Sequence, residues 1–88
     1  MQRLYRKRSR KEMMLDILEA VKEGPERPTR IMYRANLSWS VCQDLLGHLV
    51  GRGLIRLIAE GERKRYELMP KGSQVIGWSS KAADEIGT

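Results

Sequence analysis

The most regular hydrophobic pattern in the chain lies between Met13 and Val21. Apolar side chains recur there at helical spacing, which predicts a buried helix face made of Met13, Met14, Ile17, Leu18, Ala20 and Val21. Ser9 and Glu12 form a capping-box pair ahead of this stretch, and Gly24-Pro25 predicts its end. The acidic side chains share a separate face: Glu12, Asp16, Glu19 and Glu23. Because this face repels phosphate, we expect the helix to point it away from any nucleic acid.

Two further helices are predicted between Pro28 and Arg52. Pro28-Thr29 can open the first, which is expected to run to about Ala35 with Ile31 and Met32 on its apolar face. Asn36-Leu37-Ser38 predicts a turn, because asparagine tolerates a left-handed backbone and serine is a favourable N-cap. The second is expected from about Trp39 to Arg52, with an inward stripe of Cys42, Leu45, Leu46, Leu49 and Val50.

Beyond Gly51-Arg52-Gly53 the helical spacing gives way to two short strand-like segments. Leu54–Ala59 and Lys64–Leu68, joined through Glu60-Gly61-Glu62-Arg63, predict a β-hairpin. Gly53 suits a left-handed position at the end of the preceding helix. Pro70 then suits the first turn of a last helix, whose loose apolar face comprises Val75, Ile76, Trp78, Ala82, Ala83 and Ile86.

The order of these elements predicts a winged helix-turn-helix. The fold class is α+β and mainly α, with three helices, a two-stranded hairpin that forms the wing, and a C-terminal helix. We expect three parts along the chain: a basic N-terminal arm (1–8), the winged helix-turn-helix domain (9–69) and the C-terminal helix (70–88), which is a candidate dimerisation element.

Positive charge is concentrated at the N-terminus and in the middle of the chain. The 88 residues carry a formal net charge of +6. Residues 1–11 contain no acid and the cations Arg3, Arg6, Lys7, Arg8, Arg10 and Lys11, and basic residues again outnumber acidic ones between Pro28 and Arg65. A phosphate backbone is the common partner for this distribution. A solvated surface that only keeps the protein soluble is the alternative.

The residues that most catalytic and metal sites need are missing. Cys42 is the only cysteine and His48 the only histidine, which excludes intrachain disulfides and the usual zinc finger. Asp44 and His48, one helical turn apart, are expected to form an ordinary surface pair. We therefore expect no enzyme activity, cofactor or metal site. No apolar run is long enough to span a membrane, and a reduced, cytoplasmic, nucleoid-associated protein is expected.

In a helix-turn-helix the second helix of the pair enters the major groove of double-stranded DNA. Its candidate contacts here are Ser38, Trp39, Ser40 and Gln43, because hydroxyls bind phosphate or bases and glutamine pairs with adenine. Trp39 either meets a sugar or a thymine methyl group, or packs back on the preceding helix. No arginine lies on this face before Arg52, which favours limited sequence specificity.

The other expected DNA contacts are cations on the phosphate backbone. They comprise Arg30 and Arg34 on the preceding helix, Arg63, Lys64 and Arg65 on the wing, and Arg6, Lys7 and Arg8 on the arm. Because alternate strand residues point to opposite faces, Arg63 and Arg65 are expected to act together, with Lys64 opposite.

The stretch from Arg8 to Gly72 resembles a family of small archaeal winged-helix proteins. The matching segments are Arg8-Ser9-Arg10, Ile17-Leu18-Glu19-Ala20, Gly24-Pro25, Thr29–Ser38, Gly53-Leu54-Ile55, Tyr66-Glu67-Leu68 and Pro70-Lys71-Gly72. This family includes predicted transcriptional regulators and basic chromatin-associated proteins, so the resemblance implies the winged-helix fold and DNA binding. Some members dimerise through a long C-terminal helix, which implies a homodimer.

Several functions stay open at this point. The leading hypothesis is a DNA-binding transcriptional regulator. A nucleoid-architectural protein with little sequence preference is favoured by the strongly basic arm and by the third helix, which carries few residues that distinguish bases. A winged-helix module that binds another protein through Trp39 or Trp78 is the alternative from a different class, and an RNA role is a further one.

Overall fold

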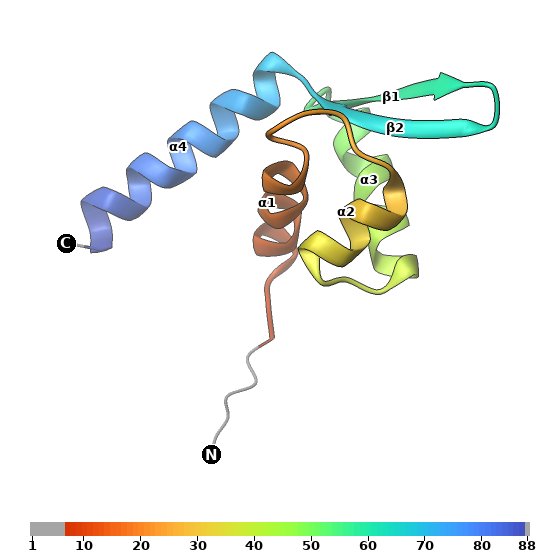
Figure 1. Cartoon of the computed structure of the whole chain (residues 1–88). Helices are drawn as coiled ribbons and strands as arrows, with labels where there is room; N and C mark the ends of the chain where they lie inside the picture. The colour runs from red at the N-terminus through yellow and green to blue at the C-terminus, as the bar shows by residue number, and fades with distance from the viewer. Residues whose placement is uncertain (1–6, 88) are drawn as a thin grey trace.

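The computed structural model describes the backbone of residues 7–87 and the side chains of residues 7–78. The elements follow in the order α1 (Arg10–Ala20), α2 (Pro28–Ala35), α3 (Trp39–Gly51), β1 (Ile55–Glu60), β2 (Arg63–Leu68) and α4 (Pro70–Gly87). Figure 1 shows α1, α2 and α3 grouped together, with the β1–β2 hairpin projecting to one side and α4 leaving the body on the other. This arrangement confirms the predicted winged helix-turn-helix.

One hydrophobic core joins the helices to the hairpin. Its fully buried side chains come mainly from α1 and α3: Ile17, Leu18, Val21, Ile31, Cys42, Leu45, Leu46, Leu49 and Ile55. Tyr66 of β2 and Ile76 of α4 close the core, each 9% exposed. Full burial of one large aliphatic side chain contributes about 1.5–3 kcal/mol. Burial also raises the pKa of the Cys42 thiol, which therefore acts as a small apolar core group.

The predicted capping box starts α1. The Ser9 hydroxyl accepts the backbone N–H of Glu12 at 3.0 Å, and the Glu12 carboxylate accepts the backbone N–H of Ser9 at 2.8 Å. The predicted end at Gly24-Pro25 was wrong, because α1 stops at Ala20. A tighter turn follows, with hydrogen bonds between residues three apart: the N–H of Val21 donates to the Leu18 carbonyl and that of Lys22 to the Glu19 carbonyl, each at 3.2 Å.

The turn between α2 and α3 has the conformation that its residues predict. Asn36 adopts the left-handed backbone, with φ 55° and ψ 55°. The N–H of Leu37 then donates to the carbonyl of Met32 at 3.0 Å, which ends α2. The Ser38 hydroxyl accepts the N–H of Val41 at 3.3 Å and caps α3. These two caps set where the third helix begins and in which direction it runs.

The wing is an antiparallel hairpin in which Ile55 pairs with Leu68 and Glu60 with Arg63. Gly61 lies at its tip with a positive φ of 64°, a conformation that glycine adopts without strain. A further contact was not predicted: Glu26, just before α2, forms a single antiparallel bridge to Tyr66 in β2. Their backbone groups exchange hydrogen bonds of 3.0 and 2.8 Å. The start of α2 is thereby fixed to the wing.

The start of α4 packs tightly against the loop before β1. The N–H of Met69 donates to the Leu54 carbonyl at 3.0 Å. A Cβ added at Gly72 would collide with that carbonyl oxygen and lie 2.7 Å from Leu68 Cδ1, so only glycine fits there.

Two expected core positions prove to be exposed. Val50 of α3 is 37% exposed and Trp78 of α4 is 67% exposed, because neither helix is covered on that side by the described residues. The side chains of Ala82, Ala83 and Ile86 lie outside the described residues. None of the helices in the described part of the chain combines the length and the hydropathy that a membrane span requires.

Candidate nucleic-acid interface

A group of positive side chains surrounds the N-terminus of α2 and the adjacent wing. We call it the wing–α2 cluster: Arg27, Arg30, Arg63, Lys64 and Arg65. A hollow between α2 and the wing is lined by Arg27, Thr29, Arg30, Tyr33 and Arg65, together with Pro25 and Glu26. Two smaller hollows continue along the wing; Arg27 and Arg63 border both, and Lys64 borders one. Cations from two separate elements therefore line adjoining hollows.

The bridge between Glu26 and Tyr66 explains why these cations meet. Arg27 follows Glu26 directly, so the backbone pairing holds it beside β2. The hairpin register pairs Arg63 with Glu60 and Arg65 with Ile58, which puts the two arginines on one face and Lys64 on the other. This is the placement expected from strand alternation.

Most of the cluster keeps its charge available to a ligand. Within residues 7–78 no ion pair engages Arg27, Arg63 or Lys64. Arg30 lies 3.8 Å from Glu26 and its side chain is 65% exposed, and Arg65 lies 3.3 Å from Glu60. Exposed ion pairs of this kind contribute only about 0–1 kcal/mol, so a phosphate can replace the carboxylate at little cost.

The N-terminus of α2 adds to the positive potential of the hollow. Arg27 is its N-cap and makes no side-chain cap hydrogen bond, and Pro28 occupies the first turn. An uncapped helix N-terminus presents backbone N–H groups and a partial positive charge to anions. Tyr33, one turn further on, is 78% exposed and offers a phenolic hydroxyl at the same hollow.

The start of α3 presents the candidate base-reading residues on its exposed side. Ser40 is exposed, Gln43 is partly buried, and Trp39 is 50% exposed. Trp39 is thus partly packed and still presents half of its surface. The Ser38 hydroxyl caps the helix by accepting the Val41 N–H. The described face carries few groups that discriminate between bases.

Asp44 has a different partner from the one expected. Its carboxylate accepts a hydrogen bond from Arg10 of α1 at 3.1 Å, with both side chains more than half exposed. The expected pair with His48 was therefore wrong, because the start of α1 lies against this side of α3. The contact ties the two helices together and also leaves a negative charge on the surface of α3.

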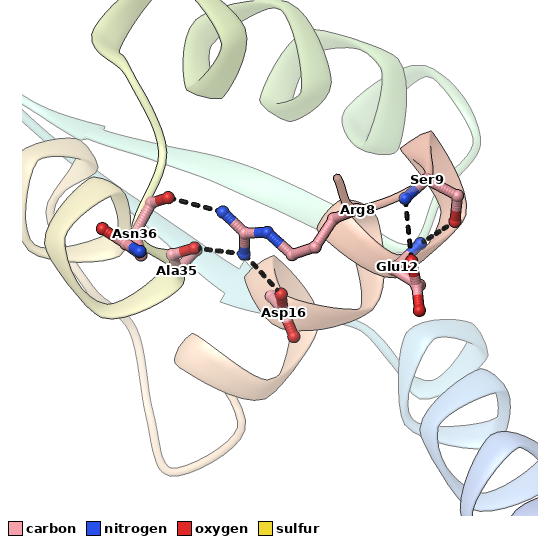
Figure 2. Close-up of polar contacts among 6 residues, drawn as sticks. All are labelled: Arg8, Ser9, Glu12, Asp16, Ala35 and Asn36. Atoms are coloured by element: carbon pink, nitrogen blue, oxygen red, sulfur yellow. Dashed lines mark hydrogen bonds and ion pairs between the residues drawn. The ribbon is translucent and has the colours of Figure 1, made fainter. Parts of the chain in front are cut away.

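Arg8, expected to contact DNA from the basic arm, is part of the folded domain instead. Figure 2 shows its guanidinium group between α1 and the end of α2. Nη1 donates to Asp16 Oδ2 and to the Ala35 carbonyl, both at 2.7 Å, and Nη2 donates to the Asn36 carbonyl at 2.5 Å. These contacts engage three of the five guanidinium N–H groups and place a positive charge at the C-terminal end of the α2 dipole.

The other proposed cations divide between the described and undescribed parts of the chain. Lys7 is exposed, whereas Arg6 lies outside the described residues. Arg34 is exposed but has partners: it lies 3.9 Å from Glu26, and its guanidinium donates to the Ala20 carbonyl at 3.5 Å. Arg34 therefore has intramolecular partners that Arg63 and Lys64 lack among residues 7–78.

Sequence reasoning missed Arg27, Thr29 and Tyr33, which line the hollow beside Arg30 and Arg65. A helix start at Pro28 does place Arg27 at the N-cap, and this was the available signal. Its proximity to the wing depends on a non-local backbone bridge. Among the described residues, no group of His, Cys, Asp and Glu side chains could hold a metal ion.

A family model described as winged helix-turn-helix matches residues 7–85. The chain belongs to the winged helix-turn-helix family. It is 35% identical over 69 residues to an uncharacterized protein of Methanocaldococcus jannaschii, a match that covers 78% of this chain and 67% of that protein. A second uncharacterized protein of the same organism is 36% identical over 70 residues, which is 80% of this chain and 31% of the relative. The resemblance to archaeal winged-helix proteins is thereby confirmed.

Solved structures of other proteins have a similar fold. The chain is similar to Sso10a-2, a DNA-binding protein from Sulfolobus solfataricus, with a TM-score of 0.79 and 31% identity over 88% of this chain and 80% of that one. It is also similar in fold to the transcriptional regulator BldR of the same organism, with a TM-score of 0.74 and 23% identity over 84% of this chain and 55% of that one.

Proposed function

We propose that this winged helix-turn-helix protein binds double-stranded DNA and acts as a transcriptional regulator in the cytoplasm, on the nucleoid. The observation that carries the proposal is the wing–α2 cluster, in which Arg27, Arg63 and Lys64 have no ion pair within residues 7–78. The similarity to a DNA-binding protein at 31% identity supports it.

In the proposed binding mode, one surface binds the phosphate backbone and another lies against the bases. The cluster and the N-terminus of α2 bind phosphates, while the exposed start of α3, with Trp39, Ser40 and Gln43, lies in the major groove. The basic arm (1–8) adds phosphate contacts through Arg6 and Lys7. A homodimer through the C-terminal helix (70–88) would present two such surfaces, and the projection of α4 from the body in Figure 1 supports this.

The test is binding to random duplex DNA of about 30 base pairs at ~50 mM and ~200 mM salt. The wild-type protein is expected to bind at low salt and to lose affinity steeply as salt rises. Arg27→Ala/Arg63→Ala removes two phosphate contacts, so the log–log salt slope should become shallower by about 2 and affinity should fall on every sequence.

Lys22→Ala/Lys71→Ala is the charge-matched control, because it removes the same charge from residues outside the wing–α2 cluster. This variant is expected to bind nearly as well as the wild type. If both double variants lose affinity equally, binding reflects net charge and not a defined interface. Absence of binding by the wild type at low salt would overturn the proposed function itself.

A second candidate function is DNA coating with little sequence preference. The small number of base-specific side chains on α3 favours this function. The exposed face of the helix offers Ser40 and Gln43, and no arginine occurs in the helix before Arg52. Ser40→Ala/Gln43→Ala separates the two: a regulator loses its preference for one site over random DNA, whereas a coating protein has no preference to lose.

A further inference from the structure

The outer edge of the wing has no strand beside it. The sheet is two-stranded, and in the part of the chain that the structure describes the one further backbone bridge is that of Glu26, on the other edge of β2. Figure 1 shows the hairpin projecting from the helices, with β1 along its outer side. A free strand edge presents unpaired N–H and C=O groups to an extended chain that can align with it.

The bridge to Glu26 shows which backbone groups of β1 point to this free edge. Tyr66 of β2 exchanges hydrogen bonds of 3.0 and 2.8 Å with Glu26, so its N–H and C=O point away from β1. Leu57 lies directly opposite Tyr66 in the hairpin. Opposed residues of an antiparallel pair alternate between bonded and non-bonded pairs, so the N–H and C=O of Leu57 point outward, as do those of Ala59 two residues further on. Within residues 7–87 no backbone hydrogen bond to another segment engages them.

The side chains of β1 complement those of a second copy of the same strand. When two β1 strands run antiparallel about Ile58, Arg56 of each copy lies opposite Glu60 of the other. Leu57, which is 43% exposed, then lies opposite Ala59 of the second copy, and the outward backbone groups of these two residues are in register to exchange hydrogen bonds. No other antiparallel register of β1 against itself pairs Arg56 with Glu60.

Both charged side chains are accessible for this contact. The Arg56 side chain is 61% exposed and that of Glu60 is 66% exposed. Each also has a partner in its own hairpin, since Arg56 Nε lies 2.7 Å from Glu67 and Arg65 lies 3.3 Å from Glu60. Alternate strand residues share a face, so Arg56 and Glu60 lie on the same side of β1. Pairing of two β1 strands therefore continues these ion pairs into a row of alternating charge across both hairpins.

We propose that the free edge of β1 is a self-association surface, through which two copies of the protein join their wings into one antiparallel sheet. The contact is small, because only residues 56–60 of each copy take part, and weak association is expected. It leaves Arg63 and Lys64 on β2, the strand away from the contact.

This contact does not compete with the homodimer proposed through α4. Figure 1 shows that the hairpin and α4 leave the body on different sides. A protein with two separate two-fold contacts on different sides can link its copies into a chain. The wing contact itself needs neither DNA nor α4.

The first test follows the mass of the full chain by sedimentation without DNA, so its outcome is independent of the proposed function. The mass of the wild type is expected to double from its smallest species as concentration rises. Arg56→Glu and Glu60→Arg each place like charges opposite one another twice, so each alone is expected to weaken association about tenfold. An equimolar mixture of the two variants restores opposite charges and is expected to associate again.

Lys64→Glu is the control for this test, because it reverses a charge of the same hairpin on β2 and is expected to leave association unchanged. Association retained in full by both Arg56→Glu and Glu60→Arg would overturn the proposal. So would equal weakening by Lys64→Glu, because association would then depend on net charge and not on the edge of β1.

Cross-linking tests the register directly and reverses no charge of the edge. Ile58→Cys places the thiols of two copies face to face at the two-fold axis, so mild oxidation is expected to give covalent dimers. Cys42 is fully buried and does not take part. Glu62→Cys, at the tip of the wing, is the control, since in this register its thiols lie roughly 27 Å apart along the strands. Equal cross-linking of the two variants, or none in Ile58→Cys, would overturn the proposal.

Discussion

Replacing Arg8 by alanine is expected to destabilise the whole domain, although the residue precedes the first helix. Its side chain is 32% exposed and binds three acceptors: Asp16 and the Ala35 carbonyl, both at 2.7 Å, and the Asn36 carbonyl at 2.5 Å. A hydrogen bond with a charged group contributes about 1.5–3 kcal/mol when buried, and a surface ion pair about 0–1 kcal/mol.

Partial exposure weakens each of these contacts, so we expect the free energy of unfolding to fall by about 2–3 kcal/mol in Arg8→Ala. For a domain of this size that corresponds to a decrease in Tm of roughly 10–20 °C. Urea and thermal unfolding, followed by far-ultraviolet circular dichroism, measure both quantities. Arg8→Lys should recover only part of the loss, because an ammonium group lacks the planar fork that reaches several acceptors.

Arg30→Ala is the matched control, since the Arg30 side chain is 65% exposed and its ion pair with Glu26 is long, at 3.8 Å. It should change stability by no more than about 0.5 kcal/mol. A double-mutant cycle between Arg8 and Asp16 isolates the ion pair and should give about 0.5–1 kcal/mol of coupling. If Arg8→Ala costs no more than Arg30→Ala, the contacts at the end of α2 do not hold the domain together and the reasoning is refuted.

Two further outcomes concern packing and pH. Gly72→Ala should destabilise the protein by about 1–3 kcal/mol in thermal unfolding, because its Cβ meets the Leu54 carbonyl. Gly77→Ala, where a Cβ meets nothing within 4 Å, should be neutral or stabilising by up to about 1 kcal/mol, and equal losses at both glycines would contradict this packing. Burial raises the pKa of the Cys42 thiol above its ordinary value of 9.0. The pKa of the Tyr66 hydroxyl is raised above 10.0, mainly by burial and to a lesser extent by the charge of Cys42. As the pH rises, the unfolded chain therefore releases these protons before the folded chain does. The free energy of unfolding, measured with urea, should be constant below about pH 9 and should fall above it. A flat profile to higher pH would argue against the burial of the two groups.

The helices were predictable because their signals are local. A capping box, a proline in the first turn and an asparagine that accepts the left-handed backbone each act within a few residues. Ser9, Pro28 and Asn36 therefore gave correct starts and a correct turn, and the strand alternation gave the faces of Arg63 and Arg65. The end of α1 was misplaced because the backbone leaves the α-helix for a turn with hydrogen bonds between residues three apart, several residues before Gly24-Pro25.

The contacts that were missed join residues far apart in the chain. Arg8 reaches the carbonyls of Ala35 and Asn36, Arg10 reaches Asp44, and Glu26 pairs with Tyr66. Charge and spacing show that Arg8 and Arg10 are cations but not which acceptors folding brings beside them.

The single bridge between Glu26 and Tyr66 has a consequence for how the protein meets its ligand. Two backbone hydrogen bonds couple the wing to the start of α2, so the backbone that carries the cations of both elements is positioned before the proposed phosphate contacts form. Fixing the backbone of one residue costs roughly 1–2 kcal/mol of conformational entropy. A backbone that is held in place in advance avoids that loss on binding. Docking by these elements should thus resemble the approach of a rigid body, with little rearrangement between the free and bound forms of the wing.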